Sequence, residues 1–193
     1  MSELWFLTPS PPNLLSPMAE VFRILITNMN YMLPKKKGKV VFVTSTVKGE
    51  GKTFVSVNLA LTLASPSKKT IIIGSDIRNP QLQRYNTARK GLIGLTEYLN
   101  DENVKLEEIV HPSSFNKNLD VIYSGSIPPN PTDLLSNGKY ETLVETLKEK
   151  YDYIILDTAP LMLVTDSFLI SEVADITLYV TRSKYTEKSL IDF

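Results

Sequence analysis

The residues best suited to carry out chemistry lie in the stretch 39–58, KVVFVTSTVKGEGKTFVSVN. An apolar run stops at Thr44, and the sequence GEGKT at residues 49–53 leads into a helical pattern. Glycines let the backbone turn so that successive amide N–H groups face one anion, and the lysine and threonine that follow can reach terminal phosphates and Mg²⁺. We interpret this stretch as a phosphate-binding loop for a nucleotide. Its expected contact residues are Val47, Lys48, Gly49, Glu50, Gly51, Lys52 and Thr53.

The strict pattern G-x-x-x-x-G-K-[ST] is missed at its first position, where Thr46 stands. The interpretation therefore depends on Gly51, Lys52 and Thr53, and on the order of strand, loop and helix around them. The simpler alternative is an ordinary glycine-rich turn between a strand and a helix, with an exposed lysine.

Acidic residues follow two later apolar runs. The run TIIIG leads into SDIR at residues 75–78, and the run YIIL ends at Asp157. In an open parallel sheet the ligand lies beyond the carboxyl ends of the strands, so these carboxylates are expected beside the phosphates. Because Mg²⁺ takes oxygen ligands and shares substrate phosphates, the expected metal-side residues are Thr53, Asp76 and Asp157.

Other roles remain open for these residues. Asp76 is placed to accept the proton of an attacking hydroxyl, and Arg78 to neutralise phosphate charge. The alternative for both is a helix cap or a solvent-facing salt bridge. For Asp157 it is a cap or turn residue, because DTAP is also good turn chemistry. Asp166 precedes a helical pattern and fits a cap as well as an active-site role.

The elements that would position these residues alternate along the chain. Strands are predicted at 40–44, 70–74, 119–123, 153–157 and 176–180, and helices at 52–63, 95–99, 140–150 and 167–173. The strands are almost continuously apolar, which indicates burial on both faces. The prediction is an α/β fold of the P-loop NTPase class, with a mostly parallel central sheet flanked by helices on both faces.

The two ends of the chain have different patterns. Residues 1–16 are rich in proline and turn formers and are expected to be a linker or arm, followed by one domain over 17–193. Residues 17–32 should form a helix, with one side made of Val21, Leu25, Asn28 and Met32. A last helical pattern begins at Thr186, and we expect it to be cut off at Phe193, with the domain truncated there.

Composition excludes several classes of protein. The 21 basic and 21 acidic residues cancel, so nothing general favours a nucleic-acid partner. The absence of cysteine excludes disulfides and thiolate metal sites and fits a cytosolic setting. No apolar run approaches the length of a membrane span, and the N-terminus lacks signal-peptide order, so the chain is expected to be soluble. The basic run at 35–39 fits a solvated turn, with contact to anionic lipid as the alternative.

Four motifs occur in a recognisable order: TSTVKGEGKT, IIIGSDIRNP, SGSIPPNPTDLL and YDYIILDTAPLMLVTDS. On these motifs the chain, from about Met18 onward, resembles the cytoplasmic domain of bacterial tyrosine kinases. These are P-loop proteins similar to partition-type ATPases, and they regulate capsular or exopolysaccharide export. The resemblance implies a non-specific protein-tyrosine kinase that uses ATP and Mg²⁺ and phosphorylates itself. It implies catalytic roles for Lys52, Asp76 and Asp157.

The same resemblance implies partners and a location. The partners are a transmembrane chain-length regulator, fused or separate, and protein tyrosine substrates that include the chain itself. A homo-oligomer and a place on the cytoplasmic side of the bacterial inner membrane are also implied.

The chain departs from the family pattern at three places. Gly74 stands where the second motif commonly has the first aspartate of D-x-D. The helical E-x-x-R-x-x-R oligomerisation motif is reduced to Glu20 and Arg23, with Ile26 in the last position. Residues 186–193 contain no tyrosine, although family members end in a tyrosine cluster.

These departures keep two alternative functions open. The first is an ATP-binding switch module of the export machinery with weak catalysis, which Gly74 and the absent tyrosines favour. The second is a partition-type ATPase. The signature lysine of that class would fall at Val47, one position before Lys48, which argues against it.

Overall fold

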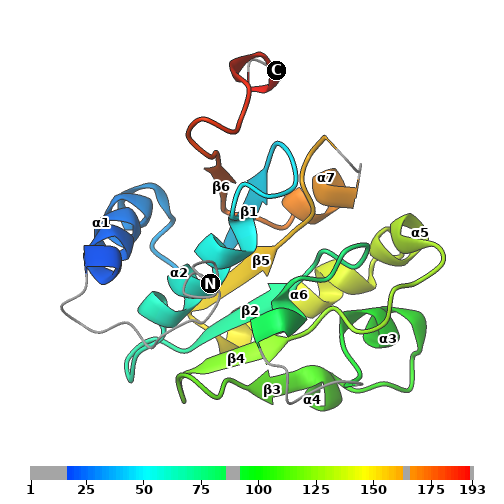
Figure 1. Ribbon diagram of the computed structural model, residues 1–193. Coiled ribbons are helices and arrows are strands. Elements are labelled where there is room, and N and C mark those ends of the chain that lie inside the picture. The colour runs from blue at the N-terminus through cyan, green and yellow to red at the C-terminus, as the bar shows by residue number, and fades with distance from the viewer. Residues whose placement is uncertain (1–16, 86–91, 163–165, 192–193) are drawn as a thin grey trace.

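The computed structural model describes residues 17–85, 92–162 and 166–191, so the predicted arm, residues 1–16, lies outside the described part. Six strands form one sheet in the order β3-β4-β2-β5-β1-β6 (Figure 1). The strands are β1 (Lys39–Ser45), β2 (Thr70–Gly74), β3 (Val110–Pro112), β4 (Leu119–Ile122), β5 (Tyr153–Asp157) and β6 (Ile176–Val180). Neighbouring strands pair in parallel, except that β3 runs antiparallel to β4. The predicted mostly parallel sheet is confirmed.

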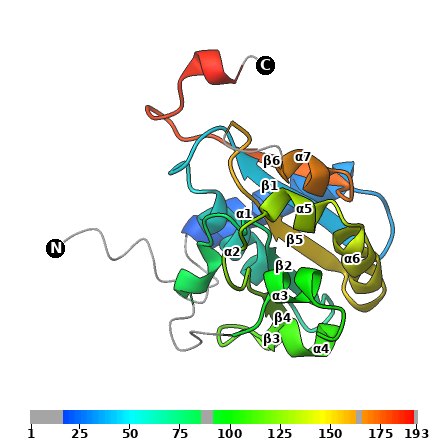
Figure 2. The ribbon, with the colours of Figure 1, turned by 90° about the vertical axis from the view of Figure 1, so that its right-hand side faces the viewer.

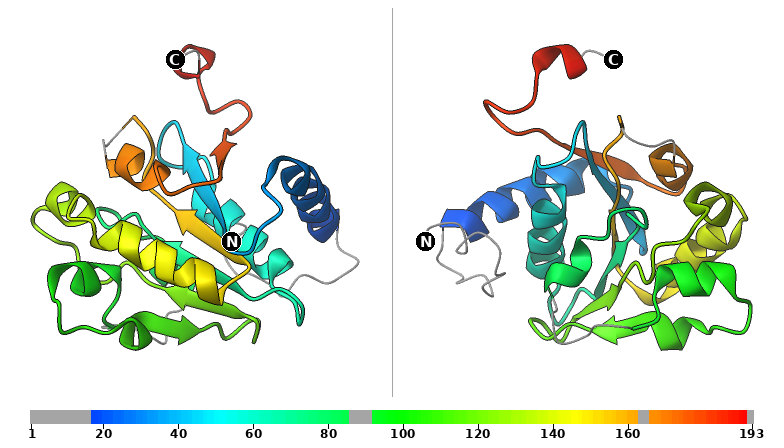
Figure 3. Two further views of the ribbon diagram at one scale, coloured as in Figure 1. Left: turned by 180° about the vertical axis from the view of Figure 1, so that it is seen from behind. Right: turned by 45° about the vertical axis from the view of Figure 1, so that its right-hand side comes forward.

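Helices cover both faces of this sheet, as the views from opposite sides show (Figure 3). One face is covered by α1 (Pro17–Met32) and α2 (Lys52–Leu63). The other is covered by α3 (Leu95–Asn100), α4 (Leu106–Ile109), α5 (Pro131–Leu135), α6 (Lys139–Lys150) and α7 (Asp166–Ser171). Two short 3₁₀ helices are η2 (Leu82–Tyr85) and η3 (Lys188–Leu190).

Alternation of side chains along each strand divides the core into two layers. In β1, Val41 and Val43 join the layer beneath α1 and α2, whereas Val40 and Phe42 join the opposite layer. Successive side chains of a strand point to opposite faces, so a strand covered on both sides must be apolar at almost every position. The strands of this sheet are therefore continuous apolar runs because helices bury them on both faces.

Helix α1 forms where it was predicted, but its buried face was predicted wrongly. Ala19, Phe22 and Met29 are buried, whereas Val21 and Met32 are 60% and 69% exposed. Asn28 is exposed too, and Leu25 is half-buried. The helix carries apolar residues on more than one side, so their spacing alone did not identify the side that contacts α2.

The C-terminal part also differs from the prediction. Strand β6 lies at the edge of the sheet opposite β3 (Figure 2), and its Thr177 and Tyr179 are exposed. The helix expected from Thr186 is present only as the short turn η3. Among the described residues, no helix has the length and apolar character needed to span a membrane.

Strand register brings three strand ends together. Asp157, the last residue of β5, is level with Val43 of β1 on one side and with Gly74 of β2 on the other. The segments that follow these strands, which begin at Thr46, Ser75 and Thr158, therefore start at one edge of the sheet. This edge is where a ligand binds in open α/β sheets.

Candidate active site

The loop between β1 and α2 has the backbone of an anion-binding turn. Gly49 and Gly51 have φ values of 93° and 99°, a conformation that costs an L-residue energy but costs glycine little. At Gly51 an added Cβ would meet nothing within 4 Å, so the backbone angle alone requires glycine. Helix α2 begins at the next residue, Lys52, and its free N-terminal amides add partial positive charge to the loop.

Part of this loop is held by its own side chains. The carboxylate of Glu50 accepts a 2.8 Å hydrogen bond from the amide of Val47, and the Ser45 hydroxyl donates to the Val47 carbonyl over 3.0 Å. Glu50 is 5% exposed. Val47 and Glu50 were predicted to contact the phosphates, but neither lies in the wall of the pocket beside the loop. The amide of Val47 is already bonded to the Glu50 carboxylate.

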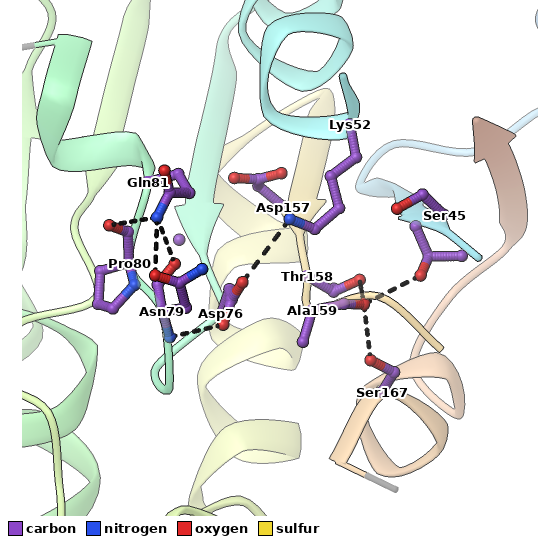
Figure 4. A network of polar contacts seen from close by, with 12 residues as sticks. Ser45, Lys52, Asp76, Asn79, Pro80, Gln81, Asp157, Thr158, Ala159 and Ser167 are labelled. Atoms are coloured by element: carbon purple, nitrogen blue, oxygen red, sulfur yellow. Dashed lines mark hydrogen bonds and ion pairs between the residues drawn. The ribbon is translucent and has the colours of Figure 1, made fainter. Parts of the chain in front are cut away.

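A pocket of about 590 Å³ opens beside the loop. Its wall includes these predicted site residues: Lys48, Gly49, Gly51, Lys52, Thr53, Asp76 and Arg78. Seven further wall residues were not among the predicted site residues. They are Phe54, Ala159 and Pro160, and four from the segment after Asp76: Asn79, Gln81, Arg84 and Tyr85. Asn79 is set by a 2.9 Å bond from its amide to Asp76 Oδ1 (Figure 4). The order of the strands thus joins the first two predicted motifs in one cavity.

Lys52 and Asp76 face each other across this pocket. Lys52 Nζ lies 3.6 Å from Asp76 Oδ2, and the two residues are only 8% and 4% exposed (Figure 4). Paired opposite charges satisfy each other where little water is present. A bound phosphate could therefore replace Asp76 as the ion-pair partner of Lys52. The Asp76 carboxylate would then be free to face a second ligand in the pocket.

Asp157 lies deeper, at the end of β5, and is 1% exposed. Burial raises the pKa of Asp157 to about 6, although the Lys52 charge and the hydroxyls of Thr53 and Ser56 act in the opposite direction. The Ser56 hydroxyl lies 3.1 Å from Asp157 Oδ1. Ser56 was not predicted. Its position one turn after Lys52 on α2 is the only signal in the sequence, because that spacing places it on the same helix face.

The donor set fits Mg²⁺ bound together with a nucleotide. Among the described residues no group of three or more histidine, cysteine or acidic side chains converges to hold a metal ion. Mg²⁺ usually takes one or two carboxylates and completes its shell with water and phosphate oxygens. The nearly buried Thr53, Asp76 and Asp157 supply a hydroxyl and two carboxylates, which match that requirement.

Arg78 is fixed from two other elements. Its Nε donates to Asp166 Oδ2 over 2.5 Å, and its Nη2 to the Thr132 hydroxyl over 2.9 Å. Burial alone would raise the pKa of Asp166, but hydrogen bonds from Arg78 and Thr132 outweigh it and hold this pKa below its usual range. Asp166 is 3% exposed and starts α7. It therefore supports a side chain of the pocket wall in addition to beginning a helix.

Gly74 has no room for a side chain. A Cβ built there would lie 2.7 Å from Ser124 Oγ, whose hydroxyl donates to the Gly74 carbonyl over 2.7 Å. Ser124 is 1% exposed. The space into which a side chain at position 74 would extend is thus filled by Ser124, from the segment after β4.

Comparison with known proteins identifies relatives of this chain. A family model described as an AAA domain matches residues 38–188. The tyrosine-protein kinase CpsD of Streptococcus pneumoniae is 37% identical over 169 residues, which make up 88% of this chain and 73% of that protein. The tyrosine-protein kinase ptk of Acinetobacter johnsonii is 33% identical over 168 residues, 87% of this chain but 22% of that longer protein.

Solved structures give the same result. The kinase domain of the Escherichia coli tyrosine kinase ETK aligns with a TM-score of 0.82 and 28% identity, over 90% of this chain and 67% of that chain. The septum site-determining protein MinD of Pyrococcus horikoshii, complexed with Mg-ADP, aligns with a TM-score of 0.63 and 22% identity, over 74% of this chain and 57% of that chain. The second likeness shows a shared fold alone.

Proposed function

Because the chain belongs to the bacterial tyrosine-protein kinase family, we propose that it is an ATP- and Mg²⁺-dependent autokinase that regulates exopolysaccharide or capsule synthesis and export. The observation that carries this proposal is the Lys52–Asp76 pair, which is set in a pocket between the phosphate loop and the carboxyl ends of the strands. It joins a phosphate-binding cation and a proton acceptor in one cavity. Phosphoryl transfer needs both groups, together with in-line positioning.

Each side chain has a role in this proposal. The loop amides from Lys48 onward and the N-terminus of α2 hold the phosphates, and Lys52 neutralises charge on the transferred group. Asp76 orients the tyrosine hydroxyl and accepts its proton. Arg78, held by Asp166 and Thr132, adds positive charge at the pocket wall.

Thr53 and Asp157, with Asp76, would hold Mg²⁺. When bound, the ion neutralises charge that builds up on the phosphate oxygens. The elevated pKa of Asp157 means that the carboxylate is unfavourable in the ligand-free protein and gains stability when a cation arrives.

Partners follow from the same proposal. The ptk relative is several times longer than the segment it shares with this chain. We propose that a transmembrane chain-length regulator, fused or separate, brings this domain to the cytoplasmic side of the inner membrane. The acceptors would be tyrosines of this chain, of other copies in a homo-oligomer, and of other proteins.

A second function has one specific observation in its favour. Ser124 occupies the space beside Gly74, so the chain lacks an acid that the resembled kinases commonly have there. An ATP-binding switch that controls the export machinery with little phosphoryl transfer would need no such acid. The amount of phosphotyrosine formed distinguishes the two functions.

Lys52→Met tests the site assignment. We expect this variant to form less than about one hundredth of the wild-type phosphotyrosine, because it lacks the cation aimed at the transferred phosphate. Lys117→Met is the matched control, since Lys117 is exposed and lies outside the pocket wall. Phosphotyrosine can be quantified by mass spectrometry after incubation with ATP and Mg²⁺. Wild-type levels in Lys52→Met would rule out this assignment.

Asp76→Asn separates chemistry from binding. We expect phosphotyrosine formation to fall by at least about a hundredfold, the usual scale of a lost general base, and ADP affinity to change much less. ADP binding can be followed by calorimetry in the presence of Mg²⁺. An equal loss of affinity and of turnover would instead make Asp76 a metal ligand only.

A further inference from the structure

The segment that follows β6 is bonded to the phosphate loop. The Tyr185 hydroxyl donates to the Lys48 carbonyl over 3.0 Å, and Arg182 Nη1 donates to the Gly49 carbonyl over 3.1 Å. The Thr186 hydroxyl bonds to the Glu50 carboxylate. Residues 182–186, here called the latch, thus contact three consecutive residues of the loop, although more than 130 residues separate the two segments in sequence.

The latch has a defined conformation of its own. The Arg182 amide donates to the Thr186 hydroxyl over 2.9 Å, and the Tyr185 and Thr186 amides donate to the Arg182 carbonyl. Lys184 has a φ of 61°, the only positive φ at a non-glycine among the described residues. Such a residue is held in place by its surroundings. These hydrogen bonds close a turn that places the Tyr185 side chain against the phosphate loop.

The latch is joined to the phosphate loop through the side chain of Glu50 and through close packing at Gly49. One oxygen of this carboxylate bonds to Thr186 and the other accepts the Val47 amide. Gly49 is packed so closely that an added Cβ would lie 2.9 Å from the Tyr185 hydroxyl oxygen. Because Gly49 lines the pocket, movement of the latch would change the shape of the phosphate site.

We propose that Tyr185 is a phosphorylation site and that its modification releases the latch and weakens nucleotide binding. The proposal deepens the kinase function above and depends on it. Tyr185 is 50% exposed, so the segment can leave the loop without uncovering a core. In the transfer, the Tyr185 oxygen forms a bond to the γ-phosphorus of ATP and the bond to the β,γ-bridging oxygen breaks. ADP leaves, and the phenol proton passes to a carboxylate such as Asp76.

The chemistry of the product explains why the latch would not close again. A phosphotyrosine has no hydroxyl to donate to the Lys48 carbonyl, and its charge of nearly −2 would face that carbonyl and the Glu50 carboxylate. The Arg182 guanidinium lies 5.1 Å from the Tyr185 ring centre. A guanidinium binds a phosphate more strongly than it binds a neutral carbonyl. Arg182 would therefore give up its hydrogen bond to the Gly49 carbonyl and bind the phosphate of residue 185.

The first test measures Mg-ADP affinity by calorimetry for chains that carry phosphotyrosine at one encoded position. Phosphorylation at 185 should weaken binding at least tenfold. Phosphorylation at 31, on an 85% exposed side chain of α1, should change it less than twofold. Tyr185→Phe should weaken binding about two- to tenfold, the range expected for one lost hydrogen bond. Equal affinities for the two phosphorylated chains, or full affinity in Tyr185→Phe, would overturn the proposal.

The second test asks whether the kinase reaches this residue. Wild-type chain, ATP and Mg²⁺ are mixed with Lys52→Met chain as an acceptor of distinguishable mass, and modified peptides are identified by mass spectrometry. Phosphate on Tyr185 of the acceptor is the expected result. Phosphotyrosine at other positions with none at 185 refutes the latch proposal and leaves the kinase function standing. If the wild-type chain forms no phosphotyrosine at all, the kinase function fails.

Discussion

At the scale of single residues, Asp157 is a proposed Mg²⁺ ligand whose buried carboxylate lowers the stability of the ligand-free protein. Its carboxyl is buried and its pKa is raised from 3.8 to about 6, so the folded protein binds this proton more tightly than the unfolded chain does. The favourable contribution is therefore fully present below about pH 4 and is lost as the pH rises through 6. At pH 7 the ionised carboxylate costs the ligand-free fold on the order of 1–3 kcal/mol.

Asp157→Asn should accordingly stabilise the ligand-free protein at pH 7 by roughly 1–3 kcal/mol, because a neutral side chain replaces a buried charge. The difference from wild type should shrink towards zero at pH 4. Urea unfolding of both proteins across pH 4 to 7 measures it. A variant that is less stable than wild type at pH 7 would show that this carboxylate is not strained by burial.

Gly74 offers a second prediction at this scale. Gly74→Asp should lower the free energy of unfolding by roughly 2–4 kcal/mol, because the new Cβ overlaps Ser124 and the new charge lies level with Asp157. Gly74→Asp combined with Ser124→Gly should recover part of this loss, since it removes the overlapping hydroxyl. Thermal or chemical unfolding of the three proteins provides the measurement. Gly74→Asp with wild-type stability would mean that the site is roomier than the structure shows.

At the level of residues, the sequence predicted the loop between β1 and α2, Asp76, Arg78 and Asp157 as site residues because each follows a recognisable strand. It did not reveal that the Glu50 side chain supports the loop instead of facing the ligand. Nor did it connect Arg78 with Thr132, since 54 residues lie between them and only the fold brings them together.

At the scale of elements, α1 shows which information the sequence lacked. The helix was predictable from its spacing and its start, but its buried face depends on the tilt of α1 against α2, which no local pattern encodes. The matched pair Met29 and Met32 tests the observed face, with exposures of 2% and 69%. Met29→Ala should cost roughly 2–4 kcal/mol of unfolding free energy through the cavity it leaves.

Met32→Ala on the same helix should change that free energy by less than about 0.5 kcal/mol, since it removes no buried contact. Both variants can be compared by guanidinium unfolding at one pH. Equal costs for the two substitutions would mean that α1 does not pack against α2 as described.

Strand β6 is a second element whose burial was predicted wrongly from the sequence. Its apolar run suggested burial on both faces, whereas alternate residues are exposed at the sheet edge. The run has the composition of a central strand, and only its place in the strand order makes it an edge. The segment beyond it forms the latch, and only the last residue of the latch, Thr186, belonged to the helix that was predicted there.

At the scale of the whole molecule, the strand order explains why residues of three separate motifs lie close together. The order β2-β5-β1 places the ends of three strands side by side, and Figure 4 shows Lys52, Asp76 and Asp157 converging there. The alternation of strands and helices predicted this convergence, because parallel strands share a carboxyl edge. The fold class and the main carboxylates were therefore within reach of the sequence, whereas contacts between distant loops required the structure.

In the proposed function, this site transfers the γ-phosphate of ATP to tyrosine. The most direct measurement is incubation of the chain with Mg²⁺ and ATP labelled at the γ-phosphate, followed by phosphoamino-acid analysis and by quantification of free phosphate. We expect label on tyrosine in the wild-type chain, and none on protein in Lys52→Met. Label that appears only as inorganic phosphate, or stays in ATP while the nucleotide binds, would contradict it.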